Sequence, residues 1–119
     1  GTNDLTQYTL AMDRGHPKLA PQVDGLSRGV LHLIAHTVRG AHAAGRHVAV
    51  CGGIASDSRG VPILLGLGVD ELSISPPAIP SIKAQIRGLR LEDCRALAEN
   101  ALAAESAEEV RALVPEPEL

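Results

Sequence analysis

The sequence predicts an α/β fold in which two short parallel strands are flanked by helices. Residues 47–50 are apolar and β-branched, residues 71–75 alternate between polar and apolar, and both segments run into loops of glycine, serine or proline. A helical pattern separates them, and strands joined through a helix pair in parallel. The 119 residues contain one Tyr and no Phe or Trp, so we expect one domain with a core of Leu, Ile, Val and Ala.

Charge and hydropathy exclude several classes of function. The net charge is −3 and the basic residues are scattered, so we expect no nucleic-acid or anionic-membrane partner. No segment approaches the roughly 20 apolar residues of a membrane span, and no signal peptide opens the chain. We therefore expect a soluble, cytoplasmic protein with no membrane insertion. Cys51 and Cys94 lie in neither a metal-binding nor a disulfide pattern, which indicates reduced thiols.

Two helices are expected before the first strand. Within residues 1–20, Asn3 or Asp4 would cap a short helix. Pro17 and Pro21 then interrupt regular structure, and a longer helix follows with Gly45 as its stop. The residues expected to line one side of these helices are Leu5, Tyr8, Thr9 and Met12 in the first, and the apolar residues Leu26, Val30, Leu33, Ile34 and Val38 in the second.

Helices and strands alternate in the remaining residues. The strand at 47–50 leads into a Cys-Gly-Gly loop, and Pro62 lies in the first turn of a helix over residues 58–67. The strand at 71–75 ends at two prolines. Helices are expected at 79–87 and 91–104, the latter with an apolar stripe, and a further helical segment from residue 107 frays over 115–119. The stripe comprises Leu91, Cys94, Leu97, Ala98 and Ala101.

Two strands cannot form a doubly covered parallel sheet alone. A (β/α)₈ barrel needs about 250 residues. We therefore expect either the C-terminal fragment of a TIM barrel, about its last third, or a chain that completes its sheet by oligomerising.

Three polar clusters are expected at the carboxyl ends of strands, where parallel-sheet enzymes keep their sites. They are residues 1–4 with Arg14, residues 51–53 and residues 73–76. Asn3 and Asp4 can bind an anion or a hard cation such as Mg²⁺, although spacing alone favours an N-cap. Arg14 can grip a phosphate or carboxylate, the alternative being a solvated surface residue.

Cysteine, histidine and glycine patterns leave further alternatives open. Cys51 is either a proton donor or nucleophile in a glycine loop or an inert buried thiol, whereas Cys94 is expected to be inert on its helix stripe. His32 and His36 have helical spacing but no third metal ligand, so they are expected on the surface. Residues 66–68, Gly-Leu-Gly, precede a strand and are expected to form a turn.

Three segments in order, GTNDLTQYTLAMDRG, VCGGIASD and GLGVDELSISPPAIPSIKAQIR, resemble Enzyme I of the bacterial phosphoenolpyruvate-dependent sugar phosphotransferase system. The relatives of Enzyme I include multiphosphoryl transfer proteins. The similarity spans nearly the whole chain. After the cysteine, Gly52-Gly53 replaces the Gly-Glu common in Enzyme I and is more similar to the multiphosphoryl branch. Pyruvate phosphate dikinase and phosphoenolpyruvate synthase share only part of these motifs.

The resemblance implies a phosphoenolpyruvate-binding barrel that passes the phosphoryl group to a histidine on a separate N-terminal domain. It implies that Asn3 and Asp4 bind phosphoenolpyruvate, that Asp4 also binds Mg²⁺, that Arg14 grips the substrate and that Cys51 protonates enolpyruvate to pyruvate. The partners implied are that phosphohistidine domain, a phosphocarrier protein and a second copy of the barrel in a homodimer.

The chain is expected to be inactive by itself. No phosphorylatable-histidine motif is present, and the arginines and glutamate that upstream barrel strands supply in the family are absent. A second hypothesis is that the chain is a structural or dimerisation module, because the resemblance places it in the dimerising domain of the family.

Overall fold

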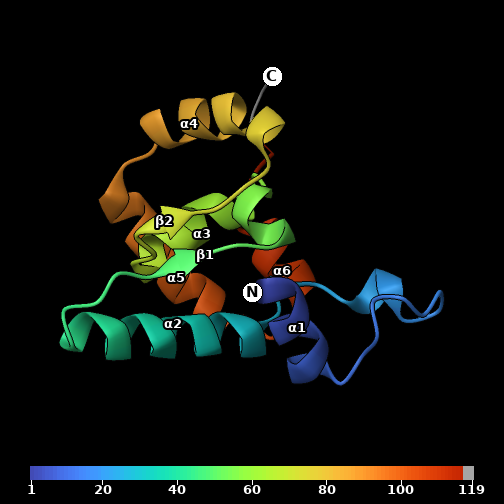
Figure 1. The fold of residues 1–119 in the computed structure, drawn as a ribbon. Helices are drawn as coiled ribbons and strands as arrows, with labels where there is room; N and C mark the ends of the chain where they lie inside the picture. The colour runs from blue at the N-terminus through green and yellow to red at the C-terminus, as the bar shows by residue number, and fades with distance from the viewer. Residues whose placement is uncertain (117–119) are drawn as a thin grey trace.

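A computed structural model describes residues 1–116 and has an α/β fold that is mostly helical. Figure 1 labels the α-helices and the strands in chain order. In the text, η denotes a 3₁₀ helix. The elements are α1 Thr2–Leu10, η1 Ala20–Gln22, α2 Arg28–Ala43, β1 Ala49–Val50, η2 Gly53–Ser56, α3 Gly60–Leu67, β2 Glu71–Leu72, η3 Pro76–Ala78, α4 Ile79–Arg87, α5 Leu91–Ala103 and α6 Ala107–Ala112.

The two strands pair in parallel, as the sequence predicts. Ala49 lies opposite Glu71 and Val50 opposite Leu72. Both strands are shorter than the predicted segments 47–50 and 71–75. Within the described residues these strands have only each other as ladder partners, so few inter-strand hydrogen bonds are available to extend them.

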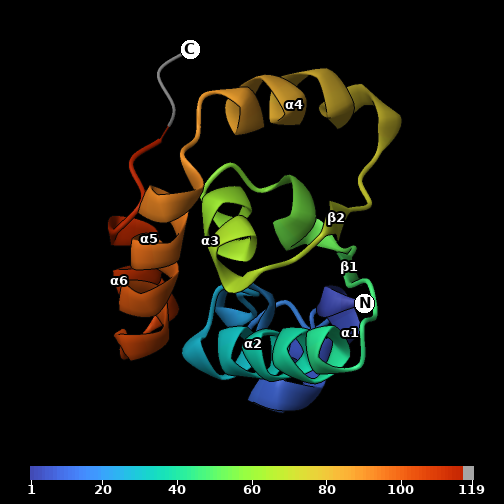
Figure 2. The same ribbon diagram turned by 90° about the vertical axis from the view of Figure 1, so that its left-hand side faces the viewer.

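Helix α3 lies in the middle of the molecule. Figure 2 shows the strands on one side of α3 and helices α5 and α6 on the other, with α1 and α2 together along one face and α4 along the opposite face. Five of the eight α3 residues are buried. The connection between β1 and β2 therefore runs through the core, which fixes where the two strands end.

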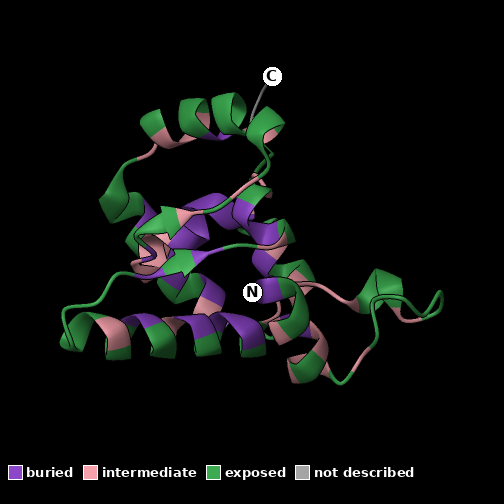
Figure 3. Cartoon of the chain, viewed as in Figure 1, coloured by how far each residue is buried: buried purple, intermediate pink, exposed green. Residues whose placement is uncertain are grey.

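Branched aliphatic side chains and alanines form the core, and buried positions cluster on α2, α3 and β1 (Figure 3). On α2 the buried residues are Val30, Leu31, Ile34 and Val38. Leu33, predicted in the stripe, is 43% exposed. The prediction was wrong here because apolar spacing fits either leucine, and the packing of α2 selects Leu31.

Helix α1 differs most from its prediction. Its N-cap is Gly1, without a side-chain cap, so Asn3 and Asp4 lie in the first turn instead of capping it. Its buried residues are Thr2 and Thr6, while Tyr8 is 87% exposed. An apolar stripe cannot anticipate this because hydrogen bonds satisfy the buried threonine hydroxyl groups.

The contact between α3 and α5 depends on Gly66. A Cβ atom at this position would overlap the Cys94 carbonyl group, so only glycine allows so close an approach. Gly66 lies within α3, so the prediction of a turn over residues 66–68 is wrong for this residue. Gly68 forms the left-handed C-cap of α3 with a φ of 96°. Cys94 is buried on α5, as predicted.

The carboxyl-terminal helix is held to two distant loops by one arginine. Arg111 on α6 contacts Asp24 through Nε at 2.7 Å and Asp57 through Nη1 at 2.9 Å. Partial burial alone would raise the pKa of Asp24, but hydrogen bonds from Arg111 and from the Leu26 N–H, together with the Arg111 charge, hold that pKa below its usual range. These contacts keep α6 packed against the domain.

The described chain ends in a short helix, α6, which the sequence predicts from residue 107. Ser106 caps α6 by accepting a hydrogen bond from the Glu109 N–H at 3.1 Å. Residues 115 and 116 have no regular secondary structure, and residues 117–119 of the predicted frayed segment lie outside the described part of the chain. In residues 1–116, no helix is both long enough and apolar enough to span a membrane.

Gly66→Ala is expected to destabilise the chain by about 2 kcal/mol or more, because the new methyl group meets backbone atoms that cannot move aside. Gly40→Ala on α2 is the matched control: no other segment approaches its Cβ position, and alanine there favours the helix by up to about 1 kcal/mol. Urea denaturation followed by circular dichroism measures both effects. Equal stability of the two variants would contradict the close packing at Gly66.

Asp24 should make the free energy of unfolding depend on pH. Because its folded pKa is lowered, the stability it contributes is fully present above the unfolded value near 3.8 and is lost as the pH falls through the folded pKa. Asp24→Asn should therefore lose less stability than the parent chain between about pH 6 and about pH 3. The exposed Glu99→Gln on α5 is the control, and a parent-like pH profile for Asp24→Asn would refute the assignment.

Candidate functional site

The three predicted clusters meet at one edge of the molecule. Cys51 follows β1 and Ser73 follows β2, so parallel pairing brings both to the same edge. The start of α1 joins them because the Thr2 N–H donates to the Cys51 carbonyl oxygen at 3.2 Å. Residues of all three clusters line one hollow of about 480 Å³, the serine hollow, which contains Asn3, Gly52, Gly53, Ser56, Ser73 and Ser75.

Asn3 links the serine hollow to a second one. Its side-chain oxygen Oδ1 accepts a hydrogen bond from the Gly53 N–H at 3.0 Å. It also lines a neighbouring hollow of about 380 Å³ together with Arg14, named here the Arg14 hollow. Asn3 therefore lies where two openings of the same edge meet, with its amide NH₂ group as a donor.

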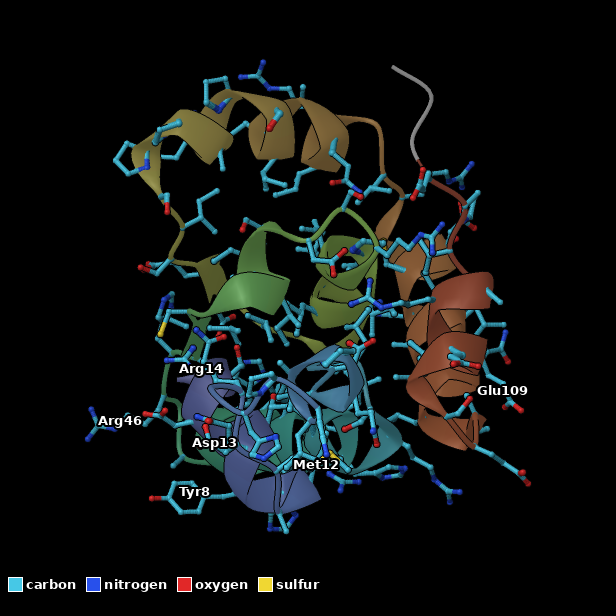
Figure 4. All side chains as sticks on the ribbon, turned by 90° about the vertical axis from the view of Figure 1, so that its right-hand side faces the viewer. Tyr8, Met12, Asp13, Arg14, Arg46 and Glu109 are labelled. Carbon is cyan, nitrogen blue, oxygen red and sulfur yellow. The ribbon has the colours of Figure 1, made fainter. Side chains whose placement is uncertain are left out.

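Arg14 returns to the start of α1 because the chain reverses after this helix. Ala11 ends α1 in the left-handed region with a φ of 53°. Gln7 Oε1 then accepts from the Arg14 N–H at 2.9 Å, and Asp13 Oδ1 accepts from the Gly15 N–H at 2.7 Å. Figure 4 shows Arg14 and Asp13 close to α1, whereas Arg46 points outward. The structure thus brings Arg14 and Asn3 together.

The opposite wall of the Arg14 hollow was not anticipated from sequence. It is formed by Asp24, Asp57 and Arg111, whose ion pairs join segments up to 87 residues apart. No local spacing signals such a group. The two carboxylates outnumber the Arg111 charge, so this wall carries one net negative charge, and Arg14 is an exposed cation of the same hollow.

Asp4 lies next to Asn3 but lines a different hollow. Its neighbours in this third hollow, of about 410 Å³, include Gln7, Tyr8 and Asp13. The Asp4 carboxylate is exposed, and Gln7 Nε2 donates to it at 3.4 Å. In the described part of the chain no group of three His, Cys, Asp or Glu residues could hold a metal ion. Asp4 can therefore supply one ligand to a cation, with the remaining ligands from elsewhere.

The two cysteines differ in exposure: Cys51 is exposed and Cys94 is buried. Cys51 is an exposed free thiol, so the alternative that it is buried is wrong. Cys94 is buried, and burial, with the nearby Asp93 charge, raises the pKa of its thiol. Cys51 is thus the accessible thiol at this edge.

The histidines on α2 bear out their expected surface position. His32 and His36 are exposed, and His32 Nε2 lies 2.8 Å from the Leu102 carbonyl oxygen. Neither belongs to a potential metal cluster in residues 1–116.

Comparisons with known proteins agree with the motifs. The multiphosphoryl transfer protein of Rhodobacter capsulatus is 58% identical over 113 residues, which are 95% of this chain and 14% of that protein. Multiphosphoryl transfer protein 1 of Escherichia coli K12 is 44% identical over 96% of this chain and 14% of its own length. A phosphoenolpyruvate-protein phosphotransferase of Haemophilus influenzae is 41% identical over 98% of this chain and 20% of its own length.

The chain therefore spans between a seventh and a fifth of the length of these curated relatives. Residues 1–91, well over half of the chain, match the family described as PEP-utilising enzyme, PEP-binding domain, where PEP is phosphoenolpyruvate. That match includes Asn3, Asp4, Arg14 and Cys51 and both strands. The chain belongs to the family of PEP-utilising enzymes, as a PEP-binding domain.

Proposed function

We propose that this chain is the PEP-binding part of a phosphotransferase that moves the phosphoryl group of PEP to a histidine on another domain and releases pyruvate. The observation that carries the proposal is that Asn3 and Arg14 line one hollow, and that Asn3 is bonded to the Gly53 N–H in the loop that follows Cys51 at the carboxyl edge of the strands. The names of the similar proteins, multiphosphoryl transfer protein and phosphoenolpyruvate-protein phosphotransferase, support it.

Substrate binding falls to Arg14 and Asn3. The planar Arg14 guanidinium can bond two oxygens of a phosphate or carboxylate at once. The Asn3 amide NH₂ can donate to a further oxygen, because its own oxygen is bonded to Gly53. Both line the Arg14 hollow, so one small anion can contact both.

The magnesium ion of the proposed reaction would take one ligand from this chain, the Asp4 carboxylate, and its other ligands from the substrate and the rest of the protein. Mg²⁺ is commonly held by one or two carboxylates and by the oxygens of substrate phosphates. Asp4 has an exposed carboxylate with a single long hydrogen bond, so it is free to bind such an ion. When bound, Mg²⁺ would neutralise charge on the phosphoryl oxygens.

Cys51 completes the reaction as a proton donor. The bond between phosphorus and the enol oxygen breaks as a histidine nitrogen of the other domain bonds phosphorus, leaving the enolate of pyruvate. The Cys51 S–H then gives its proton to carbon 3, which becomes the methyl group, and the thiolate regains a proton from water. An exposed thiol beside a glycine loop has the access this step requires.

Residues 1–119 are proposed as the C-terminal part of a (β/α)₈ barrel. The two-stranded parallel sheet and the flanking helices are consistent with a barrel segment. The other strands would belong to the part of the longer relatives that this chain does not match. The proposed partners are the phosphohistidine domain, a phosphocarrier protein and a second copy of the barrel in a homodimer. Free thiols at Cys51 and Cys94 suit a reducing compartment, which supports a cytoplasmic location.

The other candidates have less support. A pyruvate phosphate dikinase or a PEP synthase is disfavoured because the similar proteins carry phosphotransferase names. A purely structural or dimerising module would leave Arg14, Asn3 and Cys51 without a ligand, and a binding experiment distinguishes it.

Isothermal titration calorimetry of the 119-residue chain with PEP and Mg²⁺ should show binding that weakens when the metal is chelated. Arg14→Ala should reduce the affinity about tenfold to a hundredfold, because a charge-assisted bond is lost. Arg46→Ala is the matched control, since this exposed arginine points away from the site (Figure 4). No heat under any condition would contradict binding by the 119-residue chain alone and would mean that the other barrel strands complete the site. Unchanged affinity in Arg14→Ala would remove Arg14 from the substrate site.

Turnover can be tested in a chimaera in which this chain replaces the matching 113 residues of the Rhodobacter capsulatus relative. Cys51→Ala should abolish pyruvate formation while PEP binding is kept, because only the proton donor is removed. Cys94→Ala, which changes a buried thiol on α5, should retain turnover. An inactive parent chimaera would contradict the proposed function, and an active Cys51→Ala chimaera would remove Cys51 from it.

A further inference from the structure

We propose that Thr2 is a positioning residue that fixes the Cys51 thiol relative to the first turn of α1, which carries the proposed substrate-binding residues. This inference rests on the proposed function, because it takes Cys51 as the proton donor. Its basis is a buried hydroxyl group that bonds to a segment 49 residues away along the chain.

The three threonines of α1 use their hydroxyl groups in two different ways. Thr6 donates to the Thr2 carbonyl at 2.6 Å and Thr9 to the Leu5 carbonyl at 2.7 Å, both within the helix, as threonines in helices commonly do. Thr2 is the first helical residue and has no preceding turn. Its hydroxyl donates instead to the Cys51 carbonyl oxygen at 2.6 Å.

Two further bonds hold the same loop against α1. The Thr2 backbone N–H also donates to the Cys51 carbonyl, at 3.2 Å, and the Gly53 N–H donates to Asn3 Oδ1 at 3.0 Å. The loop is therefore held on both sides of Gly52. Thr2 itself is only 4% exposed, so its hydroxyl bond is shielded from competing water.

The conformation of the loop explains why it needs this contact. Gly52 has a φ of 100°, and a Cβ atom there would overlap Thr2 Oγ1, so glycine is required for the close approach. Two consecutive glycines give the backbone wide conformational freedom when nothing holds it. Since the Cys51 side chain is exposed, the backbone on either side largely determines where its thiol lies.

The same turn of α1 carries the proposed substrate-binding groups. Asn3 and Asp4 directly follow Thr2, and Asn3 shares the Arg14 hollow with Arg14. A bond from Thr2 to Cys51 thus fixes the proton donor relative to the substrate. Proton transfer is sensitive to such placement, and a displacement of about 1 Å can cost a hundredfold in rate.

Thr2→Val in the chimaera removes the hydroxyl but keeps the shape of the side chain. We expect kcat for pyruvate formation to fall about tenfold to a hundredfold with little change in KM for PEP. The solvent deuterium isotope effect should increase because protonation becomes slower, while the first-turnover phosphorylation of the acceptor histidine stays at the parent rate. Thr2→Ser keeps the hydroxyl and should restore turnover.

Thr9→Val is the matched control, since its hydroxyl bonds only within α1. Amide hydrogen exchange on the 119-residue chain gives a second readout: Gly53 should exchange faster in Thr2→Val and at the parent rate in Thr9→Val. Thr2→Ala, which also lacks the hydroxyl and introduces no bulk, takes the place of Thr2→Val if that variant does not fold.

Each outcome supports or overturns a named claim. Parent-like kcat and Gly53 exchange in Thr2→Val, with Cys51→Ala inactive, would overturn the role of Thr2 and leave the proposed function intact. Equal losses in Thr2→Val and Thr2→Ser, or in Thr2→Val and Thr9→Val, would also overturn it, as would a matching fall in histidine phosphorylation. Unchanged pyruvate formation in Cys51→Ala would instead reject the proposed proton donor.

Discussion

The close contact between α3 and α5 is the constraint on which the rest of the domain depends. Helix α3 is the connection from β1 to β2, so its depth in the core determines where both strands end. That depth is possible because Gly66 presents no side chain to the Cys94 backbone. In a close-packed interior, a small change in the volume of one side chain shifts the residues packed around it. The site is built from the loops that follow the two strands, so its geometry depends on the contact between α3 and α5 on the other side of α3.

Polar groups join the segments on the side of the domain that carries the site. Arg111 ties α6 to Asp24 and Asp57, and these residues form one wall of the Arg14 hollow. Threonine hydroxyl groups and the Asn3 side chain hold α1 to the loop after β1. A charged or hydrogen-bonded framework of this kind adds directionality to packing, because each bond fixes an angle as well as a distance.

Sequence patterns were most informative where burial alone decides the structure. The period of apolar residues located α2, α4 and α5 and the parallel strands, whereas it missed the exposure of Leu33 and the threonine face of α1. Motifs identified the family and the strand-end clusters, and those clusters meet in the structure. The ion pairs of Arg111 and the bond from Thr2 to Cys51 join distant segments, so no local rule could predict them.

The hydrogen bond from the Gly53 N–H also fixes the orientation of the Asn3 amide, and so which hydrogen-bonding groups Asn3 offers to a ligand. With its oxygen committed to the Gly53 N–H, the amide cannot flip, because a flipped group would set two donors against each other. The Gly53 N–H thus fixes which end of the Asn3 amide faces the loop and which end, the NH₂ group, is left to donate. The Asn3 amide therefore offers only N–H donors to the hollow, so it can bond to the lone pairs of a ligand oxygen and not to a ligand's own N–H or O–H groups.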